Sequence, residues 1–88
     1  MSQKDQKLVT GRQIAAARSL LAIGQSELAT SASISVPTLK RMEASEGPAA
    51  GMANNVRAVI AALEAAGVEF IPANGGGAGV RLRDSRGG

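Results

Sequence analysis

The chain has 88 residues, 44% of them apolar, and a formal net charge of +3. A chain of this length forms one small domain with a modest core, because it buries only about 60–70% of the surface that the unfolded chain exposes. It contains no cysteine and no histidine, which excludes a disulfide scaffold, a zinc site built on these residues, and nucleophilic catalysis by either of them. Alanine supplies 17 of the apolar residues and Phe70 is the only aromatic one. This composition is typical of a compact helical module.

The sequence carries no signal for a membrane or for export. It has no run of about 18 apolar residues, which a transmembrane helix would need. Residues 1–7 are polar, unlike the apolar segment of a signal peptide. We therefore expect a cytoplasmic protein with no membrane partner, and the lack of cysteine fits a reducing compartment.

The charges are distributed unevenly along the chain. Residues 1–41 carry a net charge of +4, residues 42–79 carry −3, and residues 80–88 carry +2. A basic half next to an acidic segment indicates a face that binds a polyanion. A solvated surface with no such partner would show the same mild asymmetry.

The first part of the chain predicts an arm and two helices. Residues 1–9 are expected to be a flexible arm. Thr10 is a good N-cap for a helix over residues 11–22. A second helix is expected over residues 25–31, preceded by Gly24 as an acceptable N-cap.

A third helix and a fourth helix follow, separated by a loop. Ser35 is a good N-cap for a helix over about residues 36–44, in whose first turn Pro37 is tolerated. Residues 45–53 contain two glycines and one proline and are predicted to be a loop. The fourth helix is expected over residues 56–66, capped by an asparagine at position 54 or 55.

The C-terminal residues change from helical to alternating periodicity. Residues 68–71 and 80–83 predict two short strands, and the glycine-rich residues 74–79 predict the turn between them. The fold class is therefore mainly α, with about four helices and a C-terminal β-hairpin over 68–83. Residues 84–88 are expected to be a disordered tail.

The spacing of apolar residues over 25–43 is that of a helix-turn-helix unit. Counted from Gln25 as position 1, apolar residues fall at positions 4, 8, 10, 15 and 18. A small residue, Ala29, stands at position 5, where two helices that cross closely leave no room for a larger side chain. The apolar positions are Leu28, Ala32, Ile34, Leu39 and Met42.

The stretch RQIAAARSLLAIGQSELATSASISVPTLKRMEA resembles the Cro/cI-type (XRE-like) family of bacterial and phage DNA-binding regulators. The resemblance covers residues 10–67 and implies a lambda-repressor-like helical bundle. The chain is especially similar to short bacterial members that end in a GVEFIP…GGG…GVRLR segment, as residues 67–83 do here. The resemblance implies that the third helix enters the DNA major groove.

By position, the family's DNA-contacting residues fall on the third helix and on the start of the second. The family uses a glutamine at the position of Gln25 to hold a phosphate and to brace the recognition helix. Arg41 is suited to a bidentate contact with guanine or to a phosphate, whereas Lys40 is suited to a phosphate. The residues concerned are Gln25, Ser35, Val36, Pro37, Thr38, Lys40 and Arg41.

Several of these residues also have a purely structural interpretation. Ser35 is a plausible N-cap, Pro37 is suited to starting a helix, and Lys40 is an ordinary surface residue type. Val36 and Pro37 have no hydrogen-bonding side chain, so we expect modest base specificity assisted by readout of DNA shape.

Two further residues are expected to support the recognition helix. In the family, the positions of Arg18 and Glu43 often form an ion pair between the first and third helices; the alternative is two exposed charges. The chain departs from the family at Ser33, where a glycine is usual, and at Gly24, where serine or threonine is usual. Serine in a left-handed conformation would cost about 1 kcal/mol.

The predicted hairpin is a candidate dimerisation element, because a two-stranded hairpin is marginal alone. Its apolar residues would pair two copies across a two-fold axis, or would pack on the fourth helix of the same chain. The residues assigned to dimerisation are Val68, Phe70, Ile71, Val80 and Leu82.

No enzyme, metal site or cofactor is expected. The seven carboxylates are scattered and the usual acid–base groups are nearly absent. The glycine run is followed by an alternating strand pattern rather than by the helix that a phosphate-binding loop needs.

The sequence therefore predicts a transcriptional regulator, most simply a repressor, that binds double-stranded DNA as a homodimer on an inverted-repeat operator. The alternative is an antitoxin-like or anti-repressor module that binds a protein partner, with DNA binding secondary.

Overall fold

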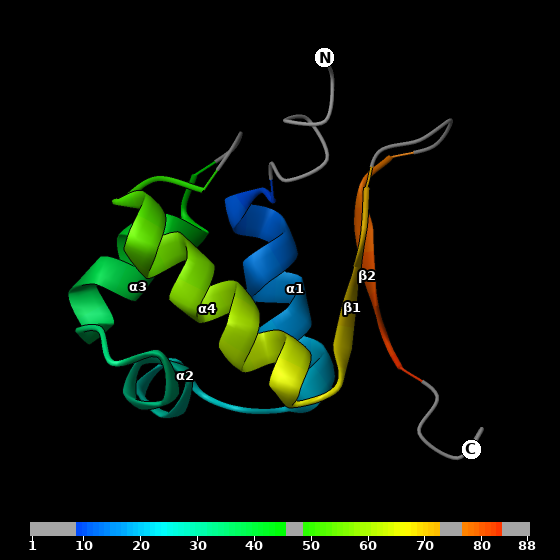
Figure 1. Ribbon diagram of the computed structural model, residues 1–88, viewed down its shortest axis with the longest axis horizontal. Coiled ribbons are helices and arrows are strands. Elements are labelled where there is room, and N and C mark those ends of the chain that lie inside the picture. Colours follow the sequence, from blue (N-terminus) through cyan, green and yellow to red (C-terminus); the bar gives the residue numbers. More distant parts are fainter. Residues whose placement is uncertain (1–8, 46–48, 73–76, 84–88) are drawn as a thin grey trace.

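The computed structural model describes residues 9–45, 49–72 and 77–83. Over these residues the chain forms four helices followed by two strands (Figure 1). Their bounds are α1 Gly11–Leu21, α2 Gln25–Ala32, α3 Val36–Glu43, α4 Ala53–Ala65, β1 Val68–Ile71 and β2 Gly79–Leu82. The predicted fold class, mainly helical with a C-terminal hairpin, is confirmed. Residues 1–8 of the predicted arm and the predicted tail over 84–88 lie outside the described residues.

Local hydrogen bonds at the predicted caps begin two of the helices. The Thr10 hydroxyl accepts a hydrogen bond from the backbone N–H of Gln13, whose side chain accepts from the Thr10 N–H in return, forming a capping box. The Ser35 hydroxyl accepts from the backbone N–H of Thr38 at the start of α3. Ser33 ends α2 with φ 59°, the left-handed conformation expected at this turn.

The start of α4 differs from the prediction. The helix begins at Ala53, three residues before Val56, and its N-cap is Met52, which makes no side-chain capping bond. Asn54 and Asn55 therefore lie inside the first turn. The helix gains this turn without a side-chain cap, because the backbone of Met52 accepts bonds from Asn55 and Val56 instead.

One hydrophobic core joins all four helices and β1. The helix-turn-helix spacing is confirmed, since Leu28, Ala29, Leu39 and Met42 are at most 2% exposed and Ala32 is 7% exposed. Ile34 is half-buried and packs against the same core. The remaining buried apolar residues are Ile14, Ala17, Val59, Leu63 and Val68.

Gly11 lets the start of α1 approach the end of α3 very closely. A Cβ at this position would meet the backbone oxygen of Met42 and would lie 2.6 Å from that of Ser45. Real Cβ atoms do not approach a backbone oxygen this closely, so only glycine fits without a shift of α3. The C-terminal end of α3 is thus positioned by direct backbone packing on α1.

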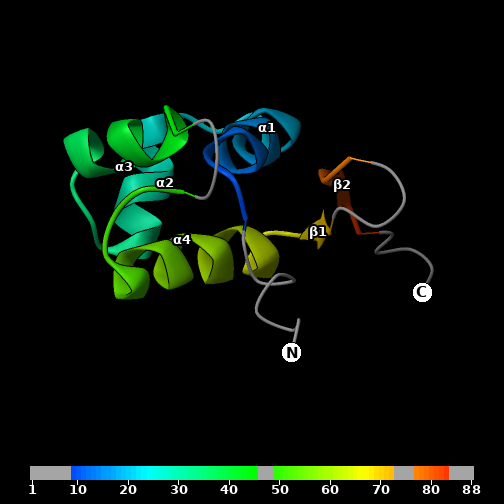
Figure 2. The ribbon, with the colours of Figure 1, turned by 90° about the horizontal axis from the view of Figure 1, so that it is seen from above.

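The hairpin closes one side of the helical bundle. The two strands are antiparallel, with Val68 opposite Leu82 and Phe70 opposite Val80. The second strand begins at Gly79, one residue earlier than predicted. Seen from above, α1 and α3 lie in one layer, α4 lies in another, and the hairpin stands beside α1 (Figure 2).

Candidate nucleic-acid interface

The exposed face of α3 carries the two basic residues assigned to DNA. Pro37, Lys40 and Arg41 are exposed, and their spacing of three and four residues places them on one helical face. Leu39 and Met42 point the other way and are fully buried. The helix is therefore fixed to the core by one face and presents the opposite face, with its two cations, to solvent.

The hydroxyl groups at the start of α3 are paired with each other. Ser35 Oγ donates to Thr38 Oγ1 at 2.8 Å while it accepts the Thr38 backbone N–H at 3.2 Å. One hydroxyl proton of the pair is thus used within the helix, and the other is left for a phosphate or a base.

Val36 and Pro37 differ in how far they project. Val36 is half-buried and packs against the core, whereas Pro37 is exposed and occupies the first turn of α3. Pro37 is therefore the apolar group of this pair with more surface to offer a thymine methyl. The missing N–H of Pro37 costs α3 nothing, since an N–H in the first turn has no partner inside the helix.

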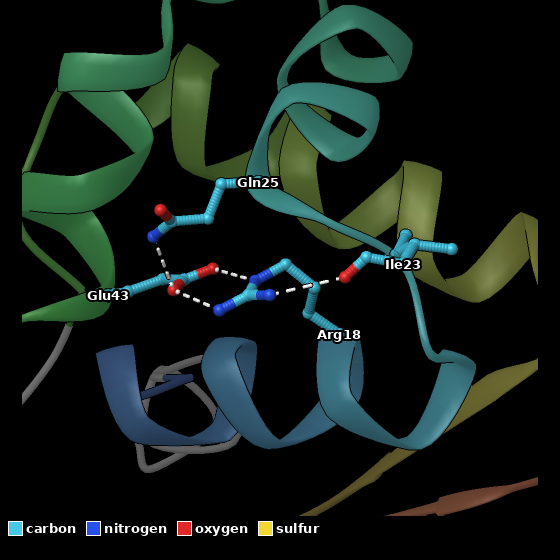
Figure 3. Close-up of polar contacts among 4 residues, drawn as sticks. All are labelled: Arg18, Ile23, Gln25 and Glu43. Carbon is cyan, nitrogen blue, oxygen red and sulfur yellow. Dashed lines mark hydrogen bonds and ion pairs between the residues drawn. The ribbon is translucent and has the colours of Figure 1, made fainter.

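The expected ion pair between α1 and α3 is present (Figure 3). Arg18 Nε lies 2.8 Å from one carboxylate oxygen of Glu43, and its terminal nitrogen Nη2 lies 3.1 Å from the other. The pair is bidentate and shielded, because the Glu43 side chain is 7% exposed and that of Arg18 is 24% exposed. The hydrogen bond to Glu43 raises the pKa of Arg18 above its ordinary value.

Two more groups join this pair into a network that links three helices. Nη1 of Arg18 donates to the backbone oxygen of Ile23, in the link between α1 and α2, at 3.2 Å. Nε2 of Gln25 donates to Glu43 at 2.9 Å (Figure 3). Glu43 therefore receives hydrogen bonds from α1 and from the first residue of α2, and it fixes the end of α3 relative to both.

Gln25, the first residue of α2, holds the end of α3 through its hydrogen bond to Glu43. One N–H of its amide is bonded to Glu43, while the amide has a second N–H that is available to another acceptor. The bracing part of the family's expected role is visible in this contact. The phosphate-holding part remains a prediction.

The hairpin residues assigned to dimerisation divide into two groups. Val68 is fully buried, and Phe70 and Val80 pack against the core of their own chain. The alternative interpretation expected this packing on the fourth helix, but β2 packs on α1, and β1 contacts both α4 and α1. Val68 therefore offers no surface to a partner. Ile71 is half-buried and Leu82 is 50% exposed, so whether they contact a second copy stays a prediction.

Gln13 has a role that the sequence analysis missed. It is a buried polar residue, 6% exposed, and its amide nitrogen donates to the backbone oxygen of Gly79 at 3.0 Å. The same nitrogen lies 3.5 Å from the backbone oxygen of Ile71. Threonine followed three residues later by glutamine is a capping-box signal, but nothing in the sequence indicates that this glutamine also holds the hairpin.

The described ranges contain no cluster of three or more histidine, cysteine, aspartate or glutamate residues that could hold a metal ion. Within the same residues, no helix is long and apolar enough to cross a membrane. Comparison with protein-family models gave no match, and comparison with curated protein sequences gave none either.

Proposed function

We propose that the protein is a sequence-specific transcriptional regulator that inserts α3 into the major groove of double-stranded DNA. The observation that carries this proposal is the exposed face of α3, with Lys40 and Arg41 on a helix whose opposite face is buried. A recognition helix needs both properties, because its side chains must reach base edges from a rigid support.

Each residue on this face has a distinct role in the proposal. Arg41 reads guanine through a bidentate contact, Lys40 neutralises a phosphate, and Thr38 donates its hydroxyl to the backbone or to a base. Pro37 contacts a thymine methyl. With only one strong base-reading side chain, much of the specificity comes from DNA shape and deformability.

In this proposal two copies bind an inverted repeat, so that their recognition helices enter successive major grooves about 34 Å apart. A protein of this kind acts most simply as a repressor, by occupying DNA that polymerase needs, and it works in the cytoplasm on the nucleoid. It requires no cofactor. Binding is dominated by phosphate contacts and weakens steeply as salt is raised.

A second candidate function is an antitoxin-like or anti-repressor module that binds another protein. An apolar groove along α4, lined by Val56, Ile60 and Phe70, favours this candidate, because exposed apolar grooves are common sites of protein contact. Under this alternative a protein partner co-purifies through α4, and DNA binding through α3 is secondary.

An NMR titration separates the two candidates. The isotope-labelled protein is titrated with duplex DNA at low salt, and backbone amide shifts are followed along the chain. The proposal expects the largest shifts in residues 35–41 and at Gln25, with the hairpin unaffected. Absence of any shift, or shifts confined to α4, would contradict it.

A further inference from the structure

An apolar groove runs along one flank of α4 and is lined on its other side by Phe70 of β1 and by Val9. Val56 and Ile60 from α4 and Phe70 from β1 are half-buried and line it. All three are in contact with solvent on the groove side, although they are among the few large apolar residues of a small domain. Covering a groove of this kind with a complementary apolar surface removes apolar groups from water and is therefore favourable.

Two opposite charges flank the apolar centre of this groove. Arg57 and Glu64 also line it, seven residues apart on α4 and on either side of Ile60. Seven residues are two helical turns, or about 10 Å along the axis. In the described part of the chain, neither side chain takes part in an ion pair.

This arrangement is self-complementary under a two-fold axis. In a symmetric dimer the same patch is used by both copies, so that a residue i meets a residue j and j meets i. If two α4 helices lie antiparallel with Ile60 near the axis, Arg57 of each copy faces Glu64 of the other. A parallel arrangement would instead place like charges together.

The same operation provides apolar contacts at the ends of the helix. Met52, directly before α4, is 69% exposed and is the most exposed of the large apolar residues in the described ranges. Antiparallel pairing brings the N-terminal end of one α4 close to the C-terminal end of the other. The chain enters β1 at that C-terminal end, and Phe70 of β1 lines the groove. An exposed methionine and a half-buried aromatic ring are thereby covered together.

We propose that the α4 groove is the homodimer interface and that its occupant is α4 of a second copy, antiparallel and centred on Ile60. The inference deepens the proposed function, and rests on it for the requirement of two copies. It places the dimer contact on α4 and Phe70 rather than on the exposed strand residues. Its test uses no DNA, so failure of self-association and failure of operator binding are separate results.

The experiment reverses one charge in each of two separate variants and then mixes the two variants. Arg57→Glu places two like-charged pairs across the proposed axis, and so does Glu64→Arg. Neither change should unfold the protein, because each puts the charge that the helix dipole favours near its end of α4. Mixed in equal amounts, however, the two variants have opposite charges at both contacts and should form a heterodimer.

The measurement is sedimentation equilibrium over a range of concentrations, with circular dichroism to check folding. Wild type should dimerise, and each single variant should dimerise roughly tenfold or more weakly, because like charges across an interface are repulsive. The equimolar mixture, and the double variant that carries both changes, should recover most of the wild-type affinity. Arg12→Glu is the matched control, since Arg12 is exposed and does not line the groove; it should dimerise like wild type.

Several outcomes would overturn the proposal. A wild-type protein that stays monomeric at all concentrations would mean that the groove is filled by another segment of the chain or by a different protein. Single variants that dimerise as well as wild type, or a mixture that does no better than its components, would place the interface elsewhere. Loss of dimerisation in Leu82→Ser alone would return it to the hairpin.

Discussion

Breaking the ion pair between Arg18 of α1 and Glu43 of α3 should destabilise the domain. The loss of stability should depend on which of the two residues is replaced. Glu43 is 7% exposed and accepts three hydrogen bonds, two from Arg18 and one from Gln25. Removing one partner of a buried pair leaves the other charge uncompensated, at a cost of about 3–5 kcal/mol. Arg18 is 24% exposed, so water can partly solvate it once Glu43 is gone.

We therefore expect Glu43→Ala to lower the free energy of unfolding by about 3 kcal/mol and Arg18→Ala by about 4 kcal/mol. Arg18→Ala should cost more, because the less exposed carboxylate keeps only the Gln25 donor. These are large fractions of the total, which for a domain of this size is about 4–13 kcal/mol. The double variant Arg18→Met, Glu43→Leu should recover most of the loss, because apolar residues of similar volume often replace a buried pair without penalty.

The assay is urea denaturation followed by far-ultraviolet circular dichroism, since the chain has no tryptophan or tyrosine to report by fluorescence. Glu69→Ala is the matched control: it breaks an exposed pair with Arg81, in which Arg81 lowers the pKa of the Glu69 carboxyl. That change should leave the unfolding midpoint nearly unmoved, since exposed pairs contribute little. Single alanine variants that each lose less than about 1 kcal/mol would contradict this prediction, as would an Arg18→Met, Glu43→Leu protein that is destabilised as much as either of them.

Three further predictions concern the close helix contact, the turn and the DNA-binding face. Gly11→Ala should lower the free energy of unfolding by about 1–3 kcal/mol, because the new Cβ has no room against α3; Gly77→Ala, which has open space around it and no left-handed φ, is the control and should not lower it. Ser33→Gly should raise the stability by about 1 kcal/mol, by relieving a left-handed serine, and an unchanged or lower denaturation midpoint would disprove this. Arg41→Ala should weaken specific DNA binding by about 1–3 kcal/mol with the circular dichroism spectrum intact, whereas Lys40→Ala should reduce the salt dependence by about one counterion. Fluorescence anisotropy on a selected duplex measures both, and wild-type affinity in Arg41→Ala would count against the assigned role of α3.

Local signals in the sequence were sufficient for most of the helical part of the fold. Thr10 and Ser35 cap their helices through the side-chain oxygens that made them good candidates. Ser33 takes the left-handed conformation that the family resemblance implied at this turn, where glycine is usual. These features depend on a few neighbouring residues, so periodicity and capping rules reach them.

Features set by tertiary contact were missed or misplaced. Asn54 and Asn55 looked like caps, yet both lie inside the first turn of α4, which extends back to Ala53 and has no side-chain cap. Gly11 reads as an unremarkable residue after a cap, and only the approach of α3 explains why a side chain would not fit there. The second bond of Gln13, to the hairpin 66 residues away, has no local signature.

In the candidate site, too, some features follow from local spacing and others depend on tertiary contacts. The exposure of Pro37, Lys40 and Arg41 follows from the buried positions of Leu39 and Met42 on the same helix. Contact of these residues with DNA stays a prediction. The direction in which the Gln25 amide points was not predictable, since it depends on where Glu43 lies in space. The apolar face of the hairpin was read as a partner surface, although much of it completes the chain's own core.

The most direct test of the central claim is an in vitro selection of DNA by the purified protein. The protein is incubated with random duplexes at about 0.15 M salt, where non-specific binding is weakened, and the bound pool is sequenced. If two copies of α3 read DNA across a two-fold axis, the bound pool contains a two-fold symmetric motif with half-site centres about 10 base pairs apart. A bound pool indistinguishable from the input would contradict sequence-specific binding by α3 and would favour the protein-binding alternative.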